Sequence, residues 1–201
     1  MIDFDHLLFN IEFDSRTPAP GALLVAEPFL RDAYFQHAVI CLIEYAPSST
    51  AMGIVMNHPT AYSLAHLISS IDPALEIPVF CGGPLSCDRL YYMHTLGTEI
   101  IPDSRKIKQG LYIGGDFNAM THYVNSGYPT EGCIRFFVGY SGWSQCQLDQ
   151  ELNEHTWAVA DFDTPESLLT GRGDKYWHRK VRTLGSDFRG WRYHPQNPQA
   201  N

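Results

Sequence analysis

The chain lacks long apolar runs: none of its 201 residues belongs to an uninterrupted apolar stretch of the length that crosses a bilayer. The sequence therefore predicts no membrane-spanning helix. Secretory signals need positive charge before their apolar stretch, but the first residues carry Asp3, Asp5 and Glu12. We therefore expect a cytoplasmic protein.

Metal-binding spacings are also missing. The five cysteines include no Cys-x2–4-Cys pair, Cys81 and Cys87 stand six positions apart, and there is no His-Glu-x-x-His run. An odd cysteine number in a chain of this length does not indicate a disulfide framework, which agrees with a reducing compartment. We predict no metal and no cofactor.

Basic residues are scarce over most of the chain. Residues 1–171 hold 7 Lys and Arg against 20 Asp and Glu, whereas residues 172–192 hold 7 against 2. This basic segment is interleaved with Tyr176, Trp177, Trp191 and Tyr193, a mixture typical of proteins that bind single-stranded nucleic acid. Alternatively, the segment docks on its own acidic body, and a pI near 5.5 opposes attraction to phosphate. The cations available for a weak nucleic-acid interaction are Lys175, Arg179, Lys180, Arg182, Arg189 and Arg192.

Hydrophobic residues make up 44% of the chain and aromatic residues 13%, enough apolar surface to exclude disorder as the main state. The length fits one globular domain. Pro and Gly positions predict an extended arm over residues 1–20, a domain over 21–190 and a polar tail over 191–201.

Short apolar runs bounded by Gly or Pro predict strands, and helical spacing with caps predicts helices among them. The predicted strands cover residues 22–27, 38–45, 52–56, 77–81, 89–93, 111–113, 134–140 and 157–161. The predicted helices cover residues 62–70, 117–125, a segment opened by Thr164-Pro165, and 174–184. This order favours an α+β fold with a largely antiparallel or mixed sheet curled around a core.

The segment from Tyr140 to Leu148 follows a strand and precedes a helix. A nucleophile-elbow interpretation of Ser141 fails, because Trp143 stands where that turn needs glycine. Ser144 as N-cap with Gln147 three residues later instead predicts a capping box that starts the helix.

Several motifs, taken in order, resemble the AlgH/YqgE family, whose members are often labelled transcriptional regulators. They are GALLVAEPFLRDAYF (21–35), MGIVMNHP (52–59), CGGP (81–84) with Asp88-Arg89 and His94, and RFFVGYSGWSQCQLDQEL (135–152) leading to Trp157. The two ends of the chain resemble the Bacteroides-type version. The resemblance implies a compact α+β fold with a curved, barrel-like sheet flanked by helices, and a cytosolic bacterial protein without an established enzymatic activity. Relatives usually carry glycine where this chain has Cys146, and often histidine where it has Tyr45.

We therefore expect a non-enzymatic regulatory protein that binds a protein or small-molecule partner at its surface, with no catalytic residues. Large amphipathic rings and polar residues at strand ends suit recognition, although the same residues could merely fasten turns. The candidate binding residues are Arg31, Asp32, Asn57, Gly82, Gly83, Pro84, Tyr140, Trp143 and Gln147. The alternative is a hydrolase or nucleotide-handling enzyme in which Asp32, Glu44 or Asp88 works with a recruited metal.

Overall fold

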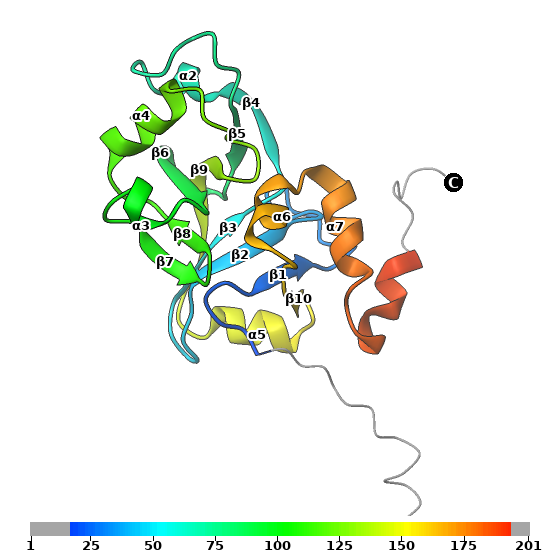
Figure 1. Ribbon diagram of the computed structural model, residues 1–201. Coiled ribbons are helices and arrows are strands. Elements are labelled where there is room, and N and C mark those ends of the chain that lie inside the picture. The colour runs from blue at the N-terminus through cyan, green and yellow to red at the C-terminus, as the bar shows by residue number, and fades with distance from the viewer. Residues whose placement is uncertain (1–16, 194–201) are drawn as a thin grey trace, which may run out of the picture.

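The computed structural model describes residues 17–193, in which ten strands form a curled sheet (Figure 1). The strands are β1 (Leu23–Ala26), β2 (Val39–Glu44), β3 (Ala51–Val55), β4 (Pro59–Ser63), β5 (Pro78–Cys81), β6 (Leu85–His94), β7 (Arg105–Lys108), β8 (Leu111–Ile113), β9 (Ile134–Trp143) and β10 (Trp157–Ala160).

The helices lie around this sheet rather than in one block. They are α2 (Leu64–Leu67), α3 (Gly97–Ile100), α4 (Phe117–Asn125), α5 (Gln147–Asn153), α6 (Pro165–Thr170), α7 (Gly173–Val181) and a 3-10 helix, η1 (Ser186–Tyr193). Within residues 17–193, no helix combines the length and the apolar character needed to cross a membrane.

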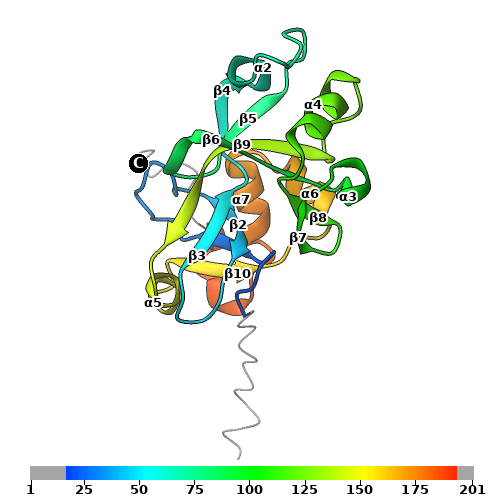
Figure 2. The same cartoon turned by 90° about the vertical axis from the view of Figure 1, so that its left-hand side faces the viewer.

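Strand β9 joins the two halves of the sheet. The order is β10-β1-β2-β3-β9-β6-β8-β7, and β5 pairs with both β4 and β9. The last residues of β9 pair with β3, whereas its earlier residues lie between β5 and β6 (Figure 2). All pairings are antiparallel except β5 with β9. The predicted fold class, an α+β fold with a curled, mainly antiparallel sheet, is therefore confirmed.

Both faces of β1 and of the first five residues of β2 are buried, which explains why these positions are all apolar rather than alternately so. Leu23 and Val25 face a cluster that includes residues of α6 and α7, such as Leu168 and Trp177. Leu24 and Ala26 belong to a second cluster with Leu148 of α5 and the rings of Trp143 and Trp157. A third cluster packs α2 and α4 against β5 and the start of β9.

Local capping signals in the sequence correctly predicted where two helices begin. Asp116 caps α4, with its carboxylate accepting the Ala119 N–H at 2.6 Å, and Thr164 caps α6 with Pro165 in the first turn. The capping prediction for α5 was wrong: the helix begins at Gln147, and its N-cap is Cys146 in a left-handed conformation. Half of the predicted box is present, because the Ser144 N–H donates to the Gln147 side chain at 3.0 Å.

Residues 1–16 of the predicted arm and 194–201 of the predicted tail lie outside the described residues. Within the tail, residues up to Tyr193 continue η1, and Trp191 packs on Phe188 with ring centroids 4.8 Å apart. The first three residues of the predicted tail are therefore part of a helix that contacts the domain.

Candidate functional site

The turn between β5 and β6 crosses directly over the backbone of β9, and glycines make that crossing possible. A Cβ at Gly82 would lie 2.3 Å from the Gly139 carbonyl oxygen, and one at Gly83 would lie 2.4 Å from the Tyr140 carbonyl. Hydrogen bonds fix the crossing, since Gly82 donates to Val138 O and accepts from Val55 N. The backbones touch here, so no side chain fits between them.

The Ser141 hydroxyl belongs to this crossing. It is fully buried and donates to the Gly82 carbonyl oxygen at 3.1 Å. The hydroxyl thus holds the turn, a role that the sequence did not predict.

An open groove of about 590 Å³ lies beside the crossing. Such a volume falls within the range of sites that bind small molecules or short segments. One wall comes from the β2–β3 hairpin, the other from the first half of β6, and the end of β9 forms the floor. The lining residues are Glu44, Thr50, Ala51, Met52, Leu85, Ser86, Arg89, Tyr91, Tyr140, Gly142, Trp143 and Ser144.

The groove is apolar along its floor and charged at its margins. Tyr91 and Tyr140 pack edge to face with their ring centroids 5.8 Å apart, and Leu85 keeps 42% of its surface exposed. At the margin, Glu44 is paired with Arg105 at 3.1 Å. Arg89 is exposed and forms no hydrogen bond or ion pair with the part of the chain that the structure describes. Among the described residues, Arg89 therefore has no ionic partner, and it lies beside an aromatic surface.

Trp143 supports the groove from below. Its side chain is only 6% exposed, and its indole N–H donates to Glu151 Oε2 at 2.8 Å. Trp157 donates to the same oxygen at 2.7 Å, and the two rings meet edge to face. Gln147 completes the arrangement by donating to Glu151 Oε1 at 2.8 Å. Glu151 thus ties α5 to both indoles and fixes the base of the groove.

The remaining candidate residues lie elsewhere. Asp32 forms a local turn in which its carboxylate accepts the N–H groups of Tyr34 and Phe35, at 2.8 and 3.1 Å. Arg31 is exposed beside it, and the loop holding both contributes nothing to the groove lining.

Asn57 is fully buried rather than presented at the surface. Its side-chain oxygen accepts the Val39 N–H at 2.8 Å, while its amide group donates to the carbonyls of His37 and Gly173 at 2.9 and 3.1 Å. All of these partners are main-chain groups, so Asn57 holds three segments together. Of the predicted residues, Tyr140 and Trp143 line the groove, and the Gly82–Pro84 turn contacts the backbone of β9 next to Tyr140.

The alternative function as a hydrolase requires the carboxylates of Asp32, Glu44 and Asp88, which lie in three different segments of the fold. Asp32 lies in the loop that precedes β2, and Glu44 is the last residue of that strand. Asp88 lies on β6. Within residues 17–193, no group of three or more His, Cys, Asp or Glu side chains is arranged to hold a metal ion.

Sequence inspection did not find a histidine cluster at the start of α7. The buried His37 ring stacks on Trp177 with centroids 4.4 Å apart, and its Nδ1 lies 3.3 Å from Asp174. Burial lowers the pKa of His58, against the opposing effect of Asp174. Burial also lowers the pKa of His178, and the nearby His37 lowers it further. Because the three histidines come from three segments, spacing alone could not have revealed them.

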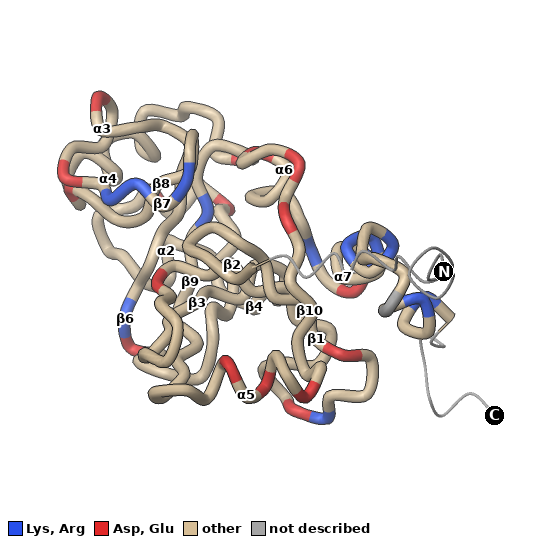
Figure 3. Tube along the Cα trace, turned by 90° about the horizontal axis from the view of Figure 1, so that it is seen from below, with Lys and Arg blue, Asp and Glu red and all other residues tan. Residues whose placement is uncertain are grey.

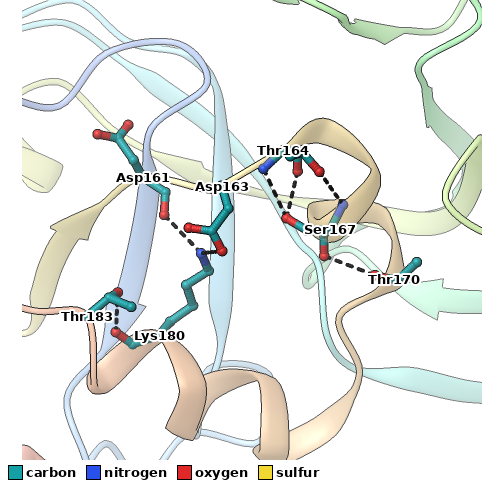
Figure 4. A network of polar contacts seen from close by, with 7 residues as sticks. All are labelled: Asp161, Asp163, Thr164, Ser167, Thr170, Lys180 and Thr183. Carbon is teal, nitrogen blue, oxygen red and sulfur yellow. Dashed lines mark hydrogen bonds and ion pairs between the residues drawn. The ribbon is translucent and has the colours of Figure 1, made fainter.

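Part of the basic C-terminal segment is buried in the domain. Figure 3 shows Lys and Arg positions gathered along α7 and the helix after it. Lys180 is buried at 1% exposure, donates to the Asp161 carbonyl at 3.0 Å and lies 3.8 Å from Asp163 (Figure 4). Tyr176 and Trp177 are also buried, so neither ring is available to stack on a base. Lys175, Arg179, Arg182, Arg189 and Arg192 remain exposed, and nucleic-acid binding through them stays a prediction.

The fold and the site together define an α+β domain with a curled sheet and an open groove over its central strand. The chain belongs to the AlgH-like family (DUF179), which matches residues 23–189.

Relatives and solved structures agree with this assignment. A UPF0301 protein from Parabacteroides distasonis is 41% identical over 194 residues, covering 96% of this chain and 97% of the relative. One from Bacteroides thetaiotaomicron is 36% identical over the full length of both chains. The solution structure of the AlgH protein from Pseudomonas aeruginosa aligns with a TM-score of 0.62 at 25% identity, covering 78% and 84% of the chains. Protein DIP2367 from Corynebacterium diphtheriae shares the fold, with a TM-score of 0.68 at 21% identity over 89% and 93%.

Proposed function

We propose that this protein is a non-enzymatic binding protein that holds its ligand or partner segment in the groove beside β9. The observation that supports this proposal is the groove itself, in which aromatic and aliphatic side chains lie next to Arg89, whose guanidinium forms no ion pair within residues 17–193. Such a surface suits a ligand with a flat apolar body and an anionic group, because the rings bury the body and the guanidinium pairs with the anion. Any effect on transcription then follows from the bound partner.

Rigid supports favour recognition at this place. Glu151 fixes the base through two indoles, and the glycine crossing fixes the floor. Groups held in position before binding lose little freedom when a ligand arrives, which increases affinity.

The experiment is a binding screen of the full chain with aromatic carboxylates and short acidic peptides, followed by titration of the hits by calorimetry. We expect Arg89→Ala to weaken a hit at least tenfold, because it removes the charge at the margin. Arg31→Ala is the matched control, since Arg31 is an exposed arginine away from the groove. The proposal would be overturned if the Arg89→Ala variant bound the ligand as tightly as the wild type while the Arg31→Ala variant bound it more weakly.

A further inference from the structure

Two cysteines flank the glycine crossing, one on each of the strands that it connects. Cys81 ends β5 and Cys87 lies in the first half of β6. The thiols of both donate to the Gly83 carbonyl oxygen, at 3.9 Å from Cys81 Sγ and 3.6 Å from Cys87 Sγ. Cys87 Sγ also lies 3.3 Å from the Pro84 carbonyl oxygen. The two thiols therefore lie around one acceptor, and they are close enough for Cys87 to act electrostatically on the Cys81 thiol.

The space near these sulfurs is kept clear by Gly139. A Cβ built at Gly139 would lie 3.4 Å from Cys87 Sγ and 2.4 Å from Gly83 O. Because glycine has no side chain, β9 places no Cβ against the Cys87 sulfur at this point.

The segment that carries Cys87 is able to adjust. The regular pairing of β6 with β9 is interrupted between Leu85 and Leu90, and Ser86 adopts a left-handed φ of 50°. Residues 87–89 are exposed. An irregular, exposed stretch of strand shifts at lower cost than a paired one, so the approach of the two sulfurs to bonding distance meets little resistance.

The two thiols differ in environment. Cys87 is exposed, whereas Cys81 is partly buried, and desolvation raises the pKa of the Cys81 thiol. None of the other three cysteines shares a hydrogen-bond acceptor with another cysteine within the described residues. Cys41 is buried with its pKa raised to about 12, Cys133 is partly buried and Cys146 is exposed. The exposed Cys87 thiol is therefore the one of the two that a dissolved reagent reaches more easily.

We propose that Cys81 and Cys87 form a reversible dithiol–disulfide pair that reacts with small-molecule disulfides of the glutathione type. The Cys87 thiolate attacks one sulfur of glutathione disulfide, which breaks that S–S bond and releases one glutathione thiolate. The Cys81 thiolate then attacks Cys87 Sγ in the mixed disulfide and releases the second glutathione. In sum, two protein thiols lose two electrons and two protons, and one glutathione disulfide becomes two glutathiones.

Closure of this bond changes the groove. Leu85 and Ser86 line the groove and lie between the two cysteines in sequence. A disulfide that draws Cys87 toward Cys81 moves both lining residues. This consequence rests on the proposed binding function, whereas the disulfide chemistry does not.

The test incubates the full chain in glutathione buffers of increasing oxidised fraction, alkylates the free thiols and measures the intact mass. We expect oxidised wild type to keep three alkylated thiols of its five and to carry no glutathione. Fragmentation of the tryptic peptide 32–89, which holds Cys41, Cys81 and Cys87, should place the bond between the last two.

Three variants make the result specific. Cys81→Ser should stop at one glutathione on Cys87, Cys87→Ser should lose thiols at least tenfold more slowly, and the control Cys146→Ser should still form the bond. Persistent glutathione on wild-type Cys87, five free thiols in oxidised buffer, or a bond that includes Cys41, Cys133 or Cys146 would overturn the proposal. If the bond forms but leaves ligand affinity in the groove unchanged, the disulfide stands and its coupling to binding is rejected.

Discussion

At the scale of single residues, one carboxylate holds the groove in shape. Glu151 accepts both indole N–H groups on one oxygen, at 2.8 Å from Trp143 and 2.7 Å from Trp157. Removing the acceptor leaves two partly buried donors without partners, and a donor stranded in this way destabilises the folded state.

Glu151→Ala is therefore expected to lower the free energy of unfolding by about 2 kcal/mol. Urea denaturation followed by tryptophan fluorescence measures it. Glu154→Ala is the control, since that carboxylate is exposed and accepts only from Gln150, and it should cost less than about 0.5 kcal/mol. Equal losses in the two variants would show that the indole bonds contribute nothing.

Three buried or partly buried histidines, His58, His94 and His178, make stability depend on pH. Desolvation lowers the pKa of His58, His94 and His178 below 6.5 in the folded protein. The unfolded chain then binds more protons than the folded one, so the free energy of unfolding is at its highest above about pH 6.5 and falls as pH decreases through that value. The groups that face His58 and His178 are His37, Asp174 and, for His178, Arg182.

Urea titrations between pH 8 and 5 should show this decrease. His178→Gln should make it shallower, because one proton-linked group is removed. A free energy of unfolding that stays constant or rises as pH falls from 7 to 5 would contradict the assignment.

At the scale of elements, the backbone at the start of α5 is strained, because a residue with a side chain adopts a left-handed conformation there. Cys146 adopts a φ of 60°, the left-handed region that favours glycine. Cys146→Gly should raise the free energy of unfolding by about 1 kcal/mol, measured by chemical denaturation. Cys146→Ala keeps a Cβ and should bring no such gain, so equal stabilities of the Gly and Ala variants would argue against strain as the cause.

The glycine crossing is the element-level feature on which the groove depends most. Gly82→Ala would place a Cβ 2.3 Å from a backbone oxygen of β9, where neither strand can move aside. We expect a loss of about 3 kcal/mol or a chain that does not fold. Gly190→Ala is the control, because a Cβ there meets nothing within 4 Å and should change stability by less than about 0.5 kcal/mol. A stable Gly82→Ala protein would show that the crossing tolerates side chains.

Sequence patterns located most elements because their signals are local. The apolar runs of β1 and β2 and the cap at Asp116 are each readable within a few residues. Strands β4 and β7 were missed because their side chains are mostly exposed or intermediate, so neither carries an apolar pattern. The predicted end of β9 at residue 140 fell three residues short, because the strand continues by changing partner from β6 to β3.

At the scale of the whole molecule, the candidate site is a product of strand pairing over long separations in sequence. Glu44, Arg89 and Tyr140 reach one groove only because β9 lies between β3 and β6. Sequence reasoning selected Tyr140 and Trp143 for their chemistry, but it grouped them with Asp32 and Asn57, which the sheet places outside the groove. Spacing along the chain holds no information on such distant pairing, whereas the family resemblance, which rested on motif order, is confirmed.

The groove's role in binding is the central claim, and chemical-shift mapping tests it most directly. Isotope-labelled full chain is titrated with an aromatic carboxylate, and the amide signals are followed by NMR. The account predicts saturable shifts concentrated at Met52, Arg89, Tyr140 and Gly142, with little change in the loop that holds Asp32. Shifts confined to that loop or to α7, or no saturable shift with any aromatic carboxylate or acidic peptide, would contradict it.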